Sequence, residues 1–340
     1  MKHVYTSLFT LALLAISSNS FAQGPNGSGT YYQAAEGKKG KELKTALCGI
    51  IKENHQKLAY NSLWGHYETT DVRADGKVWD MYSNTTNFTF VVDQDKGSGG
   101  TTEGDKFNNE HSFPNSWFGG NKQHIAYADL FHLYPADKLV NNKRSNNPYG
   151  ENNGESYKSN NNFSKLGNCT TEGYSGLVFE PNDIYKGDLA RTYFYMVTRY
   201  EDEIATWFSN YGTKDGISAT LDGNAYPGLQ EWQLNMLMKW SKNDPVDKPE
   251  VKETPRNNAV YGIQGNRNPF IDYPGLEEYI WGSMTDVAFS YNNYQVPTAI
   301  MTIKTEPTYK EGVMYNLSGQ VVDKSYKGIV IMNGKKFVNK

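Results

Sequence analysis

The sequence has few cysteines, no excess of basic charge and no long apolar run after its first residues. Cys48 and Cys169 are its two cysteines, so it allows one disulfide at most. A disulfide would fit an oxidising compartment. The alternative is two unpaired small hydrophobic residues, because Cys48 stands beside Leu47 and Ile51 on an apolar helix stripe. Two cysteines carry no spacing pattern that decides between these alternatives.

The charge balance restricts how this chain could bind an anionic polymer. Lys and Arg number 34 and Asp and Glu 37, which gives a formal net charge of −3. Proteins that bind nucleic acid are usually basic where they neutralise phosphates. Any positive field on this protein must therefore be local, which favours turnover of such a polymer over tight binding.

The only apolar run of note is short and lies at the start of the chain. Lys2 and His3 precede an apolar core over residues 8–16, and Ser20-Phe21-Ala22 offers a small-x-small cleavage site. This pattern predicts a signal peptide that is removed after about Ala22. No later stretch is long and apolar enough to span a membrane. We therefore expect a secreted or cell-surface protein, with the periplasm as an alternative location.

The remaining composition supports a folded core, with 38% apolar and 14% aromatic residues, including 25 tyrosines. Helical spacing of apolar residues predicts helices from Glu42 and over 183–200 and 227–240. Residues 78–82, 88–92 and 125–134 are typical of strands.

After residue 292, β-branched runs at 300–303, 313–317 and 329–332, with Asn333-Gly334 as a hairpin turn, predict a small β module. The predicted divisions are a signal peptide (1–22), a flexible leader (23–40), a main α+β domain (41–285) and a linker with a C-terminal β module (286–340).

Residues 108–149 hold the side chains with the clearest chemical potential. A neutral His111 imidazole could take a proton from an attacking water. Glu110 and Asn141 are hard oxygen donors of the kind that Mg²⁺ prefers. A helix that begins at Pro135 and ends before Pro148 would place Asn141 and Arg144 on one face. Arg144 could then bind a phosphate through two parallel hydrogen bonds.

A zinc site is an alternative use of the histidines in this segment. His111, His124 and His132 all carry imidazoles, a common zinc ligand. Their spacings of 13 and 8 residues match no zinc pattern that we know, so the zinc site is the weaker alternative.

Five ordered motifs resemble one protein family. Asn108 to Phe118, NNEHSFPNSWF, is similar to the NxEHxxPxSWF motif of the bacterial endonuclease I family. The further similar segments are DLFHLYPA (129–136), VNNKRSN (140–146), KGDLAR (186–191) and QGNRNPF (264–270). Together they cover roughly residues 40–285, and their shared order makes the resemblance specific.

The resemblance implies a fold and an activity. The family consists of secreted or periplasmic nucleases with a ββα-metal (His-Me finger) core, here surrounded by helices. It implies that His111 is the general base and that Glu110 and Asn141 hold one Mg²⁺, for which Mn²⁺ or Ca²⁺ could substitute. The expected substrates are DNA and also RNA, cut with little sequence preference to leave 5′-phosphates.

Two arginines in the later motifs have structural alternatives. Arg267 could contact the phosphate backbone, or the NRNP sequence could fix a turn beneath the site. Arg191, inside an amphipathic helix, is expected to be a structural ion-pair partner.

Two further expectations concern the protein as a whole. The last forty residues resemble the C-terminal β modules of exported proteins that are sorted to the cell surface, which implies an export machinery as a partner; a plain stabilising appendage is the alternative.

A non-catalytic surface binding protein is the second functional hypothesis, supported by the acidic net charge and the many tyrosines. Glu110, His111, Asn141 and Arg144 together argue against it, because a binder needs no such set.

Overall fold

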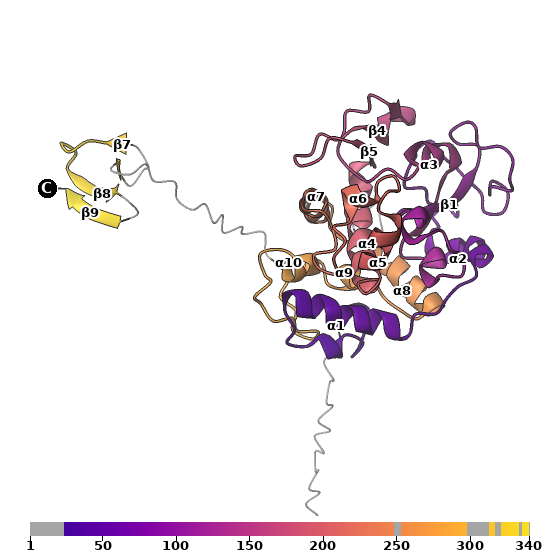
Figure 1. Ribbon diagram of the computed structural model, residues 1–340, viewed down its shortest axis with the longest axis horizontal. Helices are drawn as coiled ribbons and strands as arrows, with labels where there is room; N and C mark the ends of the chain where they lie inside the picture. Colours follow the sequence, from indigo (N-terminus) through magenta and orange to yellow (C-terminus); the bar gives the residue numbers. More distant parts are fainter. Residues whose placement is uncertain (1–23, 248–252, 298–312, 317–320, 333–334, 340) are drawn as a thin grey trace, which may run out of the picture. The chain divides into compact units, whose positions relative to one another are not determined.

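The computed structural model describes residues 24–247, 253–297, 313–316, 321–332 and 335–339 (Figure 1). The chain divides into two compact units, Met1–Pro297 and Thr298–Lys340. The predicted signal peptide, the strand expected at 300–303 and the Asn333-Gly334 turn lie outside the described residues. Within the described ranges, no helix is both long and apolar enough to cross a membrane.

The first unit mixes helices with short antiparallel sheets, which confirms the α+β class. Its helices are α1 (Gly40–Glu53), α2 (Leu63–Thr70), α3 (Lys138–Arg144), α4 (Lys186–Arg199), α5 (Ile204–Tyr211), α6 (Ile217–Thr220), α7 (Glu231–Asn243), α8 (Glu253–Gln264), α9 (Pro269–Asp272) and α10 (Leu276–Ile280). Its strands are β1 (Phe107–His111), β2 (Leu133–Asp137), β3 (Tyr157–Lys158), β4 (Lys165–Asn168) and β5 (Leu177–Glu180). β1 pairs with β2, and β3, β4 and β5 form a second sheet in that order.

Helix α4 forms the centre of the unit. All 14 of its residues are buried, and α1, α7 and α9 pack against it (Figure 1). Burial of a charged side chain requires a partner, and Arg191 has one: its Nε and Nη2 donate to the two carboxylate oxygens of Glu253 at 2.8 and 2.6 Å. The expected structural role of Arg191 is therefore confirmed.

The β1–β2 pair leads directly into α3. Residues pair from Phe107 opposite Asp137 to His111 opposite Leu133. Pro135 lies within β2, so the prediction that it begins the helix is wrong. A sheet of two strands leaves one edge of β2 open, where the missing N–H of proline breaks no ladder bond. The helix instead begins after Asp137, whose Oδ1 accepts from the Val140 N–H at 2.9 Å.

Helix α3 is also shorter than the three turns expected. It has seven residues and ends at Arg144, because Ser145 adopts φ +53° and ψ −134°. A positive φ is incompatible with a continuing right-handed helix. Asn141 and Arg144 nevertheless fall one turn apart on the same face, as predicted.

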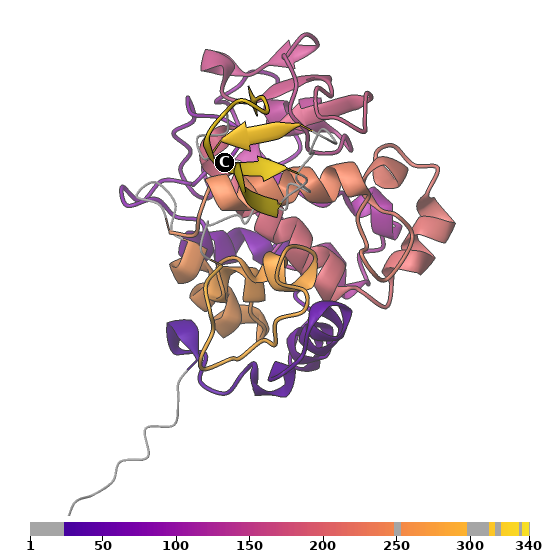
Figure 2. The ribbon, with the colours of Figure 1, turned by 90° about the vertical axis from the view of Figure 1, so that its left-hand side faces the viewer.

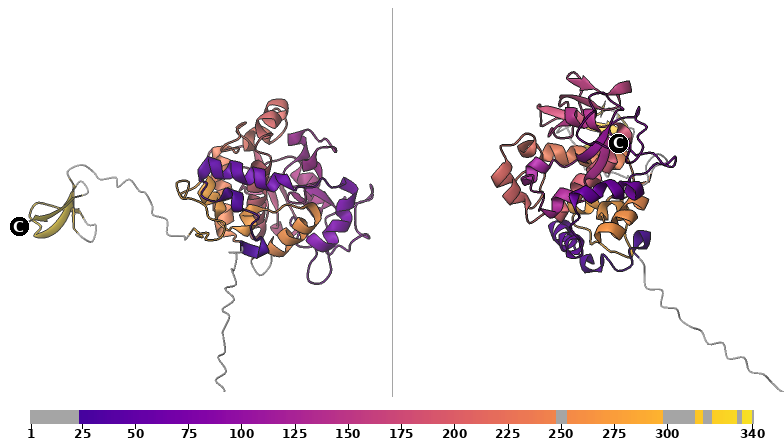
Figure 3. Two further views of the ribbon diagram at one scale, coloured as in Figure 1. Left: turned by 90° about the horizontal axis from the view of Figure 1, so that it is seen from below. Right: turned by 90° about the vertical axis from the view of Figure 1, so that its right-hand side faces the viewer.

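The expectation of a flexible leader over 23–40 is wrong for its described part. Tyr32 is fully buried, and its hydroxyl donates to Asp272 Oδ2 at 2.7 Å. Gly37 N donates to Phe289 O at 2.8 Å, and Phe289 N donates to Lys38 O at 2.9 Å. Figures 2 and 3 show the indigo N-terminal segment beside the orange one that holds Phe289. Aromatic packing and backbone bonds to a distant segment order this leader despite its glycines.

The strands expected at 78–82 and 88–92 do not form. Val78 makes an isolated bridge with Val72 and donates to Phe88 O at 3.0 Å. Val78, Phe88 and Phe107 pack instead into a small separate cluster. The strand expected at 125–134 also differs: Ile125–Ala128 is a 3-10 turn, and β2 begins only at Leu133.

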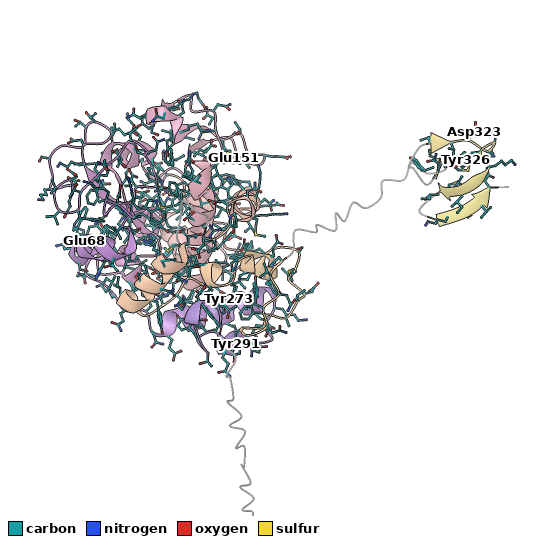
Figure 4. All side chains as sticks on the ribbon, turned by 180° about the vertical axis from the view of Figure 1, so that it is seen from behind. Glu68, Glu151, Tyr273, Tyr291, Asp323 and Tyr326 are labelled. Atoms are coloured by element: carbon teal, nitrogen blue, oxygen red, sulfur yellow. The ribbon has the colours of Figure 1, made fainter. Side chains whose placement is uncertain are left out.

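The second unit contains a four-stranded antiparallel sheet in the order β7-β6-β8-β9. Its strands are β6 (Met314–Asn316), β7 (Val321–Val322), β8 (Gly328–Met332) and β9 (Lys335–Asn339). Met332 pairs with Lys335, as a two-residue hairpin requires. Asp323 and Tyr326, labelled in Figure 4, lie in the turn before β8, where Tyr326 N donates to Asp323 O at 3.2 Å. The sorting role of this sheet stays a prediction.

Candidate active site

His111 lies at the end of β1 with both ring nitrogens engaged. Nε2 lies 3.0 Å from the carbonyl oxygen of Tyr127, and Nδ1 lies 3.2 Å from the side-chain Nδ2 of Asn115. A carbonyl can only accept, so Nε2 carries the ring proton in a neutral His111. Nδ1 then has the free lone pair and accepts from the Asn115 amide. The atom able to take a proton is therefore Nδ1.

Burial keeps this imidazole neutral. His111 is 6% exposed, and removal from water, together with the nearby His132, lowers its pKa from 6.5 to about 3. The hydrogen bond to Tyr127 acts in the opposite direction. A neutral ring is the state that a general base needs. Burial secures that state throughout the neutral pH range at the expense of basicity.

Two pairs of side chains connect β1 to α3. Asn141 Nδ2 donates to Asn108 Oδ1 at 2.8 Å, and Arg144 Nη1 donates to Glu110 Oε1 at 3.0 Å. Asn108 and Glu110 are two residues apart on a strand, so they share a face. Asn141 and Arg144 share the facing side of α3. The arrangement places the Glu110 carboxylate and the Asn141 amide between the same two elements.

Glu110 is 4% exposed, and burial raises the pKa of its carboxyl, while the charge of Arg144 lowers it. Its Oε1 also accepts from the Tyr82 hydroxyl at 2.7 Å. Within the described residues, the Glu110 carboxylate accepts these hydrogen bonds at Oε1, and the Asn141 side chain donates its bond from Nδ2. Oε2 of Glu110 and Oδ1 of Asn141 are thus two hard oxygen atoms outside these bonds.

Arg144 does not stand where a substrate phosphate could reach it. It is 1% exposed, and apart from Glu110 it donates to His111 O at 3.0 Å and Ser112 O at 2.6 Å. This placement disagrees with the prediction that Arg144 binds a substrate phosphate. A guanidinium carries five donors in a fixed fork, and here that fork holds the end of β1 and the carboxylate of Glu110.

Arg267 is likewise buried, with 2% exposure. Its Nε and Nη2 donate to the carboxylate of Asp272 at 2.6 and 2.7 Å, and Nη2 also reaches Asn258 Oδ1 at 2.7 Å. These contacts fix the segment between α8 and α9. Arg267 therefore fixes a turn, as the structural alternative predicted, and in this structure it does not face a substrate phosphate.

The zinc alternative finds no support in the described part of the chain. That part holds no group of three or more His, Cys, Asp or Glu side chains placed for a metal ion. His124 Nε2 pairs with Glu203 at 2.6 Å, and His132 Nε2 donates to Ala126 O at 2.6 Å. Cys48 and Cys169 are both free thiols, so the disulfide is absent as well.

These same two histidines fix the turn that orients His111. The turn Ile125–Ala128 carries the Tyr127 carbonyl. His124 Nδ1 accepts from the Ala126 N–H at 3.1 Å, while His132 donates to the Ala126 carbonyl. Both backbone polar groups of Ala126, which belong to the peptide units on either side of it, are thus bound by imidazoles. The turn thereby fixes the position of the Tyr127 carbonyl oxygen. That oxygen accepts from Nε2 of His111, so the ring proton stays on Nε2.

Comparison with known proteins shows which family this chain belongs to. The family model described as Endonuclease I matches residues 39–275. The chain belongs to the endonuclease I family. It is accordingly a nuclease, a hydrolase of phosphodiester bonds.

Relatives of this endonuclease I chain include proteins named for both nucleic acids. It is 35% identical to the extracellular ribonuclease of Bacillus amyloliquefaciens over 257 residues, which cover 74% of this chain and 78% of that protein. It is 36% identical to the extracellular ribonuclease of Bacillus subtilis (strain 168) over 258 residues, with the same coverage. It is 26% identical to the extracellular deoxyribonuclease of Aeromonas hydrophila over 147 residues, 43% of this chain and 49% of that protein.

Sequence reasoning about this endonuclease I chain missed the residues that support the site. Asn108 could have been found, because it stands two residues before Glu110 on the same strand face. Asn115 stands four residues after His111, but nothing in its local sequence predicts a bond to the imidazole. Tyr82 and the Tyr127 carbonyl reach the site only through tertiary packing, so no local pattern reveals them.

Proposed function

We propose that this chain is a secreted, Mg²⁺-dependent endonuclease that cuts DNA and RNA with little sequence preference and leaves 5′-phosphates. One observation carries the proposal. A neutral His111 with an accepting Nδ1 ends the same strand whose Glu110 and Asn108 accept hydrogen bonds from Arg144 and Asn141 of α3. Base and oxygen donors are therefore supplied by one compact β1–β2–α3 arrangement. We infer that this arrangement is a ββα-metal core.

The donor set fits a magnesium ion better than a transition metal. Mg²⁺ is usually held by one or two protein oxygens with several retained waters. Oε2 of Glu110 and Oδ1 of Asn141 are such oxygens, and no cluster of nitrogen or sulfur ligands competes with them in the described residues. When bound, the ion supplies positive charge against the charge that develops on the phosphate and the leaving 3′-oxygen.

The protein's own groups perform the proton transfer and the positioning. Nδ1 of His111 accepts a proton from the water that attacks phosphorus, a contribution of about 10²–10⁴ in rate. The Tyr127 carbonyl stabilises the proton on Nε2 and so the imidazolium that results. The amide of Asn115 occupies the hydrogen-bonding position at Nδ1 and would give it up to the attacking water. Arg144 keeps Glu110 and the end of β1 in place.

Support for both substrates comes from the relatives, which are named as ribonucleases and as a deoxyribonuclease. Their names also describe them as extracellular, which agrees with the signal peptide that the sequence predicts. Low sequence preference follows if recognition rests on phosphates, because phosphate contacts carry no base information.

The experiment is a plasmid and RNA degradation assay of the purified mature protein. His111→Ala is expected to lower kcat by at least about 100-fold while the protein stays folded, and EDTA is expected to stop wild-type cleavage. His66→Ala, which removes a partly exposed imidazole on α2, is the matched control and should cut normally. Near-normal activity of His111→Ala, or cleavage that persists in EDTA, would contradict the base and the metal role respectively.

A further inference from the structure

Tyr60 is a partly exposed aromatic residue in contact with the proposed base. Its ring lies within 8° of parallel to the His111 ring, with the centroids 5.9 Å apart. The Tyr127 ring meets it edge-on at 5.0 Å. Burial raises the pKa of the Tyr60 hydroxyl, and the charge of Glu110 adds to that increase. Tyr60 therefore belongs to the same site, yet the mechanism above gives it no task.

One exposed lysine lies over the ring of this tyrosine, and a second is bonded to the residue that follows the first lysine. The ammonium of Lys122 is 5.8 Å from the centroid of the Tyr60 ring. Lys57, three residues before Tyr60, donates from its ammonium to Gln123 at 2.9 Å. Both lysines are exposed. In a chain with a net charge of −3, these two cations supply the local positive field that phosphate binding requires.

We propose that Tyr60 is a stacking platform for an unpaired nucleobase of the substrate, with Lys122 and Lys57 contacting the flanking phosphates. The inference rests on the proposed function and specifies its substrate: a strand whose bases are free to leave the helix. Aromatic side chains that stack bases and cations that follow the backbone are the two elements of non-specific single-strand binding.

The geometry explains why the bound base has to be unpaired. A base paired inside a duplex has its faces covered by its neighbours, whereas a splayed base offers one face to an aromatic ring. His111 and Tyr127 pack against Tyr60 from within the protein and hold its ring in a fixed orientation. Lys122 is exposed and flexible, so a base can replace its ammonium on the ring while the ammonium moves to a phosphate. Every base has such a face, so the contact needs no particular sequence.

The competing explanation is that Tyr60 only packs against His111. Loss of the ring would then disturb the base itself and lower kcat equally on single and double strands. A stacking platform predicts a different result, because binding of unpaired bases should suffer while the chemical step is kept. KM and kcat on matched substrates therefore separate the two roles.

The test compares Tyr60→Leu with Tyr60→Phe and wild type on a single-stranded oligonucleotide and on its duplex. Tyr60→Leu is expected to raise KM for the single strand about 5- to 100-fold, with kcat within about threefold and little change on the duplex. Tyr60→Phe keeps the ring and should match wild type. Tyr261→Leu is the matched control: Tyr261 is 42% exposed, and its ring lies under the guanidinium of Arg267 at 5.2 Å.

A direct probe is the fluorescence of a single 2-aminopurine in the same oligonucleotide, measured in EDTA. Quenching on binding to wild type that is lost in Tyr60→Leu supports the platform. An equal KM change on both substrates, or a kcat loss on both, overturns it. Failure of the proposed metal role appears separately, as wild-type cleavage that resists EDTA, and the comparison of strands and the 2-aminopurine signal remain interpretable in that case.

Discussion

Arg144 illustrates how the setting of one residue decides its role. Its sequence position, one turn after Asn141, suggested a phosphate contact, but its guanidinium is buried on Glu110 and two backbone carbonyls. A buried ion pair that loses one partner leaves an uncompensated charge, which costs about 3–5 kcal/mol. At this site the arginine acts through the geometry of Glu110 and His111, as a positioning residue.

Arg144→Lys should therefore destabilise the whole fold. A lysine has one ammonium in place of a planar fork of five donors, so it cannot satisfy Glu110 and both carbonyls together. We expect the free energy of unfolding to fall by about 2–4 kcal/mol, measured by urea denaturation. Asn142→Ala, an exposed neighbour on α3, should leave it unchanged. A variant with normal stability and only a raised KM would favour the phosphate contact instead.

At the scale of elements, local patterns in the sequence predicted much but not all of the structure. The helices that became α1, α4 and α7 were predicted from their apolar spacing, although only α1 and α7 are buried on one side and all of α4 is buried. The hairpin that became β8 and β9 was predicted from its turn residues. The strands expected at 78–82 and 88–92 do not form, because one bridge and a small apolar cluster replace a ladder there. Tertiary contacts of that kind leave no local periodicity.

The short helix α3 depends strongly on its first residue. Asp137 Oδ1 accepts from the Val140 N–H, and its Oδ2 accepts from the Gly104 N–H at 2.7 Å. Asp137→Ala should cost about 1 kcal/mol or more and should also lower kcat, because α3 carries Asn141. Asp137→Asn retains one acceptor and should recover part of both. Stability from thermal melts and kcat from plasmid cleavage would check this, and an unchanged kcat with lost stability would separate α3 from the site.

For the molecule as a whole, a buried histidine predicts how stability responds to acid. Burial lowers the pKa of His55 to about 4, against an ordinary value near 6.5. Between these pH values the unfolded chain binds more protons than the folded one, so stability falls as the pH drops from about 6.5 to about 4. Above pH 6.5 this contribution is complete and constant. Arg199 Nε donates to His55 Nδ1 at 3.0 Å, which further opposes a proton on Nδ1.

The measurement is the free energy of unfolding of wild type and His55→Gln at pH 7 and pH 4.5. Glutamine keeps an acceptor near Arg199 but does not titrate, so the variant should lose less stability on acidification than wild type. The expected difference is on the order of 1 kcal/mol. Parallel losses in the two proteins would show that other groups control the acid response.

The order in which the chain is synthesised determines when the site can form. The segment with the proposed catalytic residues is completed by parts made much later: Tyr193 of α4 donates to Ser112 O at 3.0 Å, and Arg256 of α8 donates to Leu130 O and Leu133 O at 2.9 Å each. A polypeptide still on the ribosome has made His111, the proposed base, long before it has made these supports. Cleavage should therefore begin only when synthesis of the chain is nearly finished.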